Sequence, residues 1–156
     1  MKNINTYIKE GYENASQRVL RAITITEPIV KKSLEAKGYI IDDSTRDEDF
    51  QGIDLKVTNP KTNKKTIIDV KCSEEKNWNT TNFLFTIKSN KGKHYKNKKT
   101  EYVAFINFPT DEIVIVDIKK LSPLIDNTLP RKGNGEYVLL NKEEVKKLGN
   151  SIPIVK

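Results

Sequence analysis

Two alternating segments joined by a turn decide the expected fold, and residues 52–72, which contain them, read GIDLKVTNPKTNKKTIIDVKC. Apolar residues recur at every second position in residues 53–57 and again in residues 66–72, which is the spacing of strands that bury one face. Asn59, Pro60 and Asn63 mark a turn between them. Because the connection is short, we predict that the two strands pair as an antiparallel hairpin.

Three charged side chains fall on one face of this predicted hairpin. Asp69 and Lys71 are two positions apart and so point to the same side, and pairing of the strands brings Asp54 to them. Two neighbouring carboxylates attract a hard divalent cation such as Mg²⁺, and a lysine beside them can orient a metal-bound water or stabilise charge on a phosphate. The pattern therefore predicts phosphodiester hydrolysis. The alternative is three solvent-facing charges without a catalytic role, although charges inside apolar strands are costly.

The residues before the hairpin predict two helices. Residues 8–22 have helical character, and residues 27–37 carry apolar side chains at helical spacing. Thr26 is the expected N-cap of the second helix, and Gly38 is expected to end it. An extended segment is expected to follow at residues 39–41.

The residues after the hairpin predict further strands and a last helix. The segment at residues 121–125 is ambiguous between helix and strand. With no repeat and no linker in the sequence, we expect a single domain over residues 1–156. Strands are expected at residues 83–87, 102–108, 112–118 and 136–140, with a hairpin through Pro109-Thr110-Asp111, and Asn141 is expected to cap a helix over residues 142–148.

Composition limits the kinds of function. Of the 156 residues, 36% are apolar and 31% are charged, and there is no apolar run of about 18 residues that could cross a membrane. The first ten residues lack the apolar stretch of a secretory signal. One cysteine and one histidine exclude an internal disulfide and a Cys/His zinc site. We therefore expect a cytoplasmic protein with no membrane partner.

The charge balance indicates an anionic partner. The formal net charge is +7 and the pI is about 9.3, which favours nucleic acid, although a lysine-rich composition also arises from an AT-rich genome. Residues 88–99, the lysine-rich segment, read KSNKGKHYKNKK and contain six lysines and no acid. Such a segment suits phosphate contacts, with Tyr95 or Trp78 stacking on a base; the alternative is a solvated loop. The candidate nucleic-acid-binding residues are Lys88, Lys91, Lys93, His94, Tyr95, Lys96, Lys98 and Lys99.

The order of these motifs resembles the PD-(D/E)xK nuclease superfamily, and residues 27–71 look most like archaeal Holliday junction resolvases. That family has a helix with a catalytic Glu, then a Gly with a hydrophobic strand, then an Asp, then (D/E)xK. The residue that stands where the family name has proline is Ile53. The matching segments here are Glu27, Lys37-Gly38-Tyr39-Ile40, Gly52-Ile53-Asp54 and Ile68-Asp69-Val70-Lys71.

The resemblance implies a restriction-endonuclease-like α/β (α+β) fold, with a mixed central sheet flanked by helices. It implies a Mg²⁺-dependent deoxyribonuclease in which Mn²⁺ can replace Mg²⁺. Asp54, Asp69 and Glu27 would then be metal ligands, with Lys71 as the catalytic lysine. Glu13, on the preceding helix, is a rival for Glu27, whose position is also explained by the helix dipole. DNA is the implied partner. A homodimer is also implied, because a Holliday junction is cut at two positions related by symmetry.

Other functions stay open at this point. The family has a helix between its third and fourth strands, but Gly92 and the density of lysines disfavour one over residues 88–101. The chain could instead be an inactive nuclease fold that binds nucleic acid or protein, or an inhibitor or subunit that borrows the fold. Metal binding separates the nuclease from both. Branched DNA, duplex ends, a specific recognition site and RNA are all open as substrates.

Overall fold

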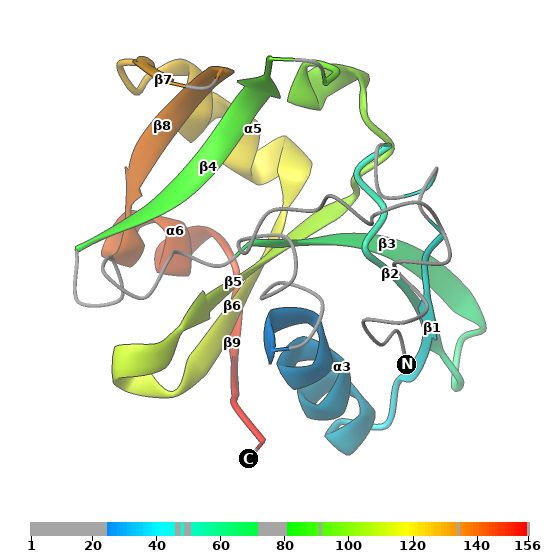
Figure 1. Ribbon diagram of the computed structural model, residues 1–156. Coiled ribbons are helices and arrows are strands. Elements are labelled where there is room, and N and C mark those ends of the chain that lie inside the picture. Colours follow the sequence, from blue (N-terminus) through cyan, green and yellow to red (C-terminus); the bar gives the residue numbers. More distant parts are fainter. Residues whose placement is uncertain are drawn as a thin grey trace.

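The computed structural model describes residues 25–45, 48, 51–71, 81–90, 92–133 and 135–155. Within these residues the chain forms a mixed six-stranded sheet, a separate three-stranded sheet and three α-helices (Figure 1). The α+β class expected from the sequence is confirmed. The helix expected at residues 8–22 lies outside the described residues, as do Cys72 and Trp78.

The six-stranded sheet contains the predicted hairpin. β2 and β3 pair antiparallel, with Leu55 opposite Ile68, and β5 then lies parallel to β3 on its other side. β5 and β6 form the second predicted hairpin. The strands stand in the order β1 (Ile40–Asp43), β2 (Leu55–Asn59), β3 (Lys64–Lys71), β5 (Tyr102–Asn107), β6 (Glu112–Asp117) and β9 (Asn150–Pro153).

The connection from β3 to β5 leaves the main sheet. It contains β4 (Asn82–Ser89), which pairs antiparallel with β8 (Gly135–Asn141), and β8 in turn pairs with β7 (Arg131–Gly133). The connection also contains a short 3₁₀ helix, η3 (Tyr95–Asn97). As predicted, the described part of residues 88–101 has no α-helix.

The two faces of the six-stranded sheet have different covers (Figure 1). On one face, Val30 and Leu34 of α3 (Glu27–Ala36) pack on Leu55, Ile68 and Ala104. The other face packs against the three-stranded sheet, α5 (Ile118–Asp126) and α6 (Lys142–Leu148). Successive residues of β5 alternate between the two covers, because side chains alternate along a strand.

The helix ends test the expected caps. The side chain of Asn141 accepts a hydrogen bond from the Glu144 backbone N–H at the start of α6, as predicted. Gly38 has φ +94° just beyond α3, also as predicted. The prediction for Thr26 was wrong: its backbone is already helical, and its side chain makes no capping hydrogen bond. An N-cap needs an extended backbone, and the turn before Glu27 does not provide one.

Candidate active site

Asp54 and Asp69 lie beside each other where β2 begins. The Asp54 N–H donates to the Ile68 carbonyl at 3.0 Å, one residue out of the Leu55–Ile68 register. The Asp54 Oδ2 accepts from the Val70 N–H at 2.7 Å. Because Ile68 faces α3, the alternation along β3 turns Asp69 toward the opposite face, and Asp54 interacts with Asp69.

Lys71 completes the group that the alternation predicts. Its Nζ lies 3.0 Å from the Asp69 Oδ2, and the two side chains are 23% and 11% exposed, respectively. The same Nζ lies 5.6 Å from the ring centroid of Phe85 on β4. The site therefore lies between the hairpin and the three-stranded sheet, where solvent screens the charges less than on an open surface.

The environment keeps Asp69 charged. Burial raises the pKa of Asp69. The charge of Lys71, hydrogen bonding with Asp54 and Lys71, and the charge of Lys98 together lower the pKa by more, so it lies below its ordinary value. These interactions favour a negative charge on Asp69 beside the ammonium group of Lys71.

Lys98 is a second lysine at the same site. Burial lowers its pKa and so does the charge of Lys71, while the charges of Asp69 and Asp54 raise it, with a net lowering. The sequence placed Lys98 only among the lysines of a phosphate-binding loop. Its place next to the acid pair depends on how the β3–β5 connection folds back, and strand alternation carries no signal for that.

Glu27 does not form a three-carboxylate group with Asp54 and Asp69. It is 8% exposed in the first turn of α3, whose apolar residues cover the face of the sheet opposite Asp69. Across the described ranges, no three His, Cys, Asp or Glu side chains are grouped to hold a metal ion. The rival candidate, Glu13, lies outside those ranges.

Two carboxylates still fit the demands of Mg²⁺. This ion takes oxygen ligands and typically keeps several waters when one or two carboxylates bind it. Asp54 and Asp69 offer such oxygens in one group, and a bound cation would offset the repulsion between two ionised carboxylates. The donor set therefore fits a hydrated Mg²⁺ held by these two residues.

The lysine-rich segment is only partly an exposed basic loop. Lys88, Lys93 and Lys99 are exposed, whereas Lys91 is outside the described residues. Tyr95 was expected to stack on a base, but it is 6% exposed and its ring packs edge-on against Phe85 with the ring centroids 5.3 Å apart. A ring buried in the core is not available to stack on a base.

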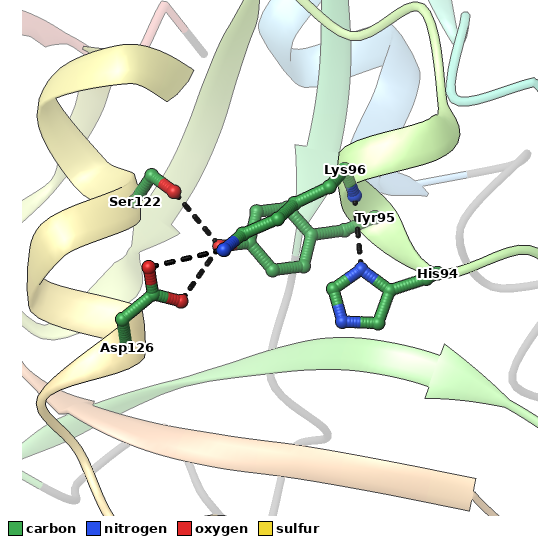
Figure 2. A network of polar contacts seen from close by, with 5 residues as sticks. All are labelled: His94, Tyr95, Lys96, Ser122 and Asp126. Carbon is green, nitrogen blue, oxygen red and sulfur yellow. Dashed lines mark hydrogen bonds and ion pairs between the residues drawn. The ribbon is translucent and has the colours of Figure 1, made fainter.

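Hydrogen bonds and ion pairs fix this part of the segment to α5 (Figure 2). The Tyr95 hydroxyl lies 2.9 Å from the Ser122 Oγ and donates to Asp126 at 3.4 Å. Lys96 forms a 3.1 Å ion pair with Asp126. The Lys96 backbone N–H donates to Nδ1 of His94, whose ring stacks on Tyr95. In this structure Tyr95, Lys96 and His94 hold the turn in place.

No protein-family model, curated protein or solved structure matches this chain. Within the described ranges, no helix has the length and apolar character needed to cross a membrane. The chemistry of the site therefore has to be inferred from its own residues.

Proposed function

We propose that this chain is a Mg²⁺-dependent endonuclease of the PD-(D/E)xK type that hydrolyses DNA phosphodiester bonds. The observation that carries the proposal is the 3.0 Å distance from Lys71 Nζ to Asp69 Oδ2, with the Asp54 carboxylate bonded to the Val70 N–H between these two residues. Two carboxylates and a lysine in one partly buried group are the residues that metal-assisted hydrolysis of a phosphodiester needs.

The strand order also supports the proposal. The resemblance implies a mixed central sheet, and here the hairpin that carries Asp69 and Lys71 is followed by a strand parallel to its second member. One difference stands out. The described part of the connection before the parallel strand contains β4 and η3, where the family has a helix.

Each residue of the group has a role in this reaction. Mg²⁺, when bound, supplies Lewis acidity and an acidified water. Asp54 and Asp69 hold the cation through carboxylate oxygens, and Lys71 donates a hydrogen bond to the attacking water or to a phosphate oxygen. The attacking water loses a proton as its oxygen forms a bond to phosphorus, the bond from phosphorus to the leaving sugar oxygen breaks, and that oxygen takes up a proton, so that one water is consumed and no net proton is needed to form the alcohol.

DNA as the substrate rests on charge. The net charge is +7, and Lys88, Lys93 and Lys99 are exposed on the connection that follows β3. Exposed lysines bind phosphates without regard to sequence, by displacing counterions. A structure-specific substrate such as a four-way junction belongs to the same proposal.

The test is a cleavage assay on plasmid, linear duplex and a synthetic four-way junction, with Mg²⁺, Mn²⁺ or EDTA. Asp69→Asn and Lys71→Met are each expected to reduce the cleavage rate by about 100-fold or more, as the loss of a group that stabilises the transition state does. Lys61→Met is the matched control, because Lys61 is exposed in the β2–β3 turn at the other end of the hairpin.

Two results would count against the nuclease. One is the absence of cleavage of every substrate in both Mg²⁺ and Mn²⁺. The other is cleavage that survives in both site variants, which would indicate a contaminating enzyme or a different site. Salt-dependent DNA binding without cleavage would instead favour an inactive nuclease fold that binds nucleic acid.

A further inference from the structure

The backbone that carries Lys98 is tied to the chain just ahead of Asp54. The Lys99 N–H donates to the Gln51 carbonyl at 2.7 Å. The Thr100 hydroxyl donates to the Gly52 carbonyl at 2.9 Å. The Lys98 N–H donates to the Tyr95 carbonyl at 3.1 Å. This bond connects Lys98 to the turn that the Tyr95 hydroxyl holds against α5 (Figure 2). Lys98 is therefore held in a defined position.

The aliphatic part of Lys98 lies directly on Gly52. A Cβ added at Gly52 would lie 3.0 Å from Lys98 Cβ and 3.2 Å from its Cδ. These contacts, the overlap with Thr100 Oγ1 and a φ of +78° all favour glycine at position 52, two residues before Asp54. They direct the lysine stem along the start of β2, so its ammonium group interacts electrostatically with Asp54, Asp69 and Lys71.

The two lysines of the site differ in what they bind. Lys71 forms an ion pair with Asp69. For Lys98, no hydrogen bond or ion pair within 4.0 Å joins the ammonium to any residue in the described ranges. Its three N–H donors are left for another acceptor.

The charges of the site favour an anion as that acceptor. Lys71 and Lys98 bring two ammonium groups to the acid pair. A divalent cation held by the carboxylates would add two positive charges. A phosphodiester supplies one negative charge and two oxygens that accept hydrogen bonds from an ammonium group.

We propose that Lys98 is a substrate-binding residue, and that its ammonium donates to a non-bridging oxygen of the DNA phosphodiester at the Asp54–Asp69 site. The inference rests on the proposed nuclease function and extends it, because it assigns the two lysines different tasks. Lys71, paired with Asp69, acts in the hydrolysis step, and Lys98 binds the DNA strand beside the carboxylates.

The experiment measures binding separately from cleavage. The full chain in EDTA is titrated against a short fluorescein-labelled DNA duplex, and anisotropy gives Kd over a range of salt concentrations. The variants are Lys98→Met, which keeps the aliphatic stem on Gly52, and Lys98→Arg, which keeps the charge; Lys61→Met is the control. Cleavage rates in Mg²⁺ are measured in parallel.

Loss of one phosphate contact has a specific signature. Lys98→Met is expected to raise Kd by about tenfold and to reduce the slope of log K against log salt by about 0.9, the share of one phosphate. Lys98→Arg is expected to restore most of the binding. Lys61→Met is expected to stay within about twofold of the wild type with an unchanged slope, because one distant exposed lysine adds little.

The outcomes separate the two proposals. If the wild type cleaves DNA but Lys98→Met matches Lys61→Met in Kd, slope and KM, the assignment of Lys98 is wrong and the nuclease stands. If the wild type does not cleave but Lys98→Met alone lowers the salt slope, Lys98 is a phosphate-binding residue and the nuclease is wrong. A wild type that does not bind DNA overturns both. Urea unfolding midpoints show whether Lys98→Met is folded, and Lys98→Arg provides the second test if it is not.

Discussion

Gly52 provides the sharpest test of how the site is held, because Gly38 is a natural control for it. Both glycines have a positive φ, +78° for Gly52 and +94° for Gly38. A Cβ at Gly38 would meet no atom within 4 Å, whereas one at Gly52 would overlap Thr100 Oγ1 and press on Lys98. Alanine at the two positions therefore shares the backbone strain and differs in the packing.

The difference can be worked out in two parts. A left-handed backbone costs an alanine about 1–2 kcal/mol at either position. At Gly52 the Thr100 hydroxyl must also move away, which loses its hydrogen bond to the Gly52 carbonyl and about 1 kcal/mol. Overpacking against Lys98 adds about 1–3 kcal/mol. Gly52→Ala is therefore expected to be less stable than Gly38→Ala by about 2–4 kcal/mol.

Urea unfolding followed by far-UV circular dichroism measures this difference directly. Equal free energies of unfolding for the two variants would refute the reasoning, because they would mean that Lys98 and Thr100 do not lie against Gly52. A DNA-binding measurement on Gly52→Ala adds a second readout. Displacement of Lys98 is expected to weaken binding in this variant and not in Gly38→Ala.

Three smaller predictions concern residues around the site and the second sheet. Tyr95→Phe removes a hydroxyl that contacts Ser122 at 2.9 Å, so a loss of about 1 kcal/mol in unfolding free energy is expected, and no loss would mean that this bond is not formed in solution. Asn141→Ala removes the N-cap of α6 and is expected to cost about 1 kcal/mol by the same measurement. Burial raises the pKa of Glu112. Hydrogen bonds, above all the one from Lys146, lower the pKa by more, so it lies below its ordinary value. A carboxyl with a lowered folded pKa stabilises the fold above its unfolded pKa of about 4.3 and ceases to do so as the pH falls through the folded value. Glu112→Gln should therefore be less stable than the wild type at neutral pH, with the difference vanishing in acid; a difference that persists in acid would contradict the assignment.

Local patterns in the sequence were enough to predict the paired strands. Alternation predicted the β2–β3 hairpin and the shared face of Asp69 and Lys71. The turn at Pro109 predicted the β5–β6 hairpin. These features depend on neighbours within about 20 residues, where periodicity and turn residues carry the information.

Features that depend on distant partners were not predicted. Nothing local in β4 indicates that it pairs with β8 in a second sheet, since its alternation suits either sheet. The burial of Tyr95 follows from Phe85 and α5 reaching it from elsewhere in the chain. Lys98 joins the site for the same reason, through its contact with Gly52.

The long-range pairing of β4 also has a consequence for synthesis on the ribosome. Phe83 pairs with Leu140, and at ~5–20 residues per second the intervening chain takes on the order of 3–11 s to be made. For that time Phe83, Phe85 and Ile87, which end up in the core, have no partner strand. A newly made chain therefore exposes an aromatic, strand-forming segment to chaperones or to other chains until β8 has been made and pairs with β4 beside Lys71.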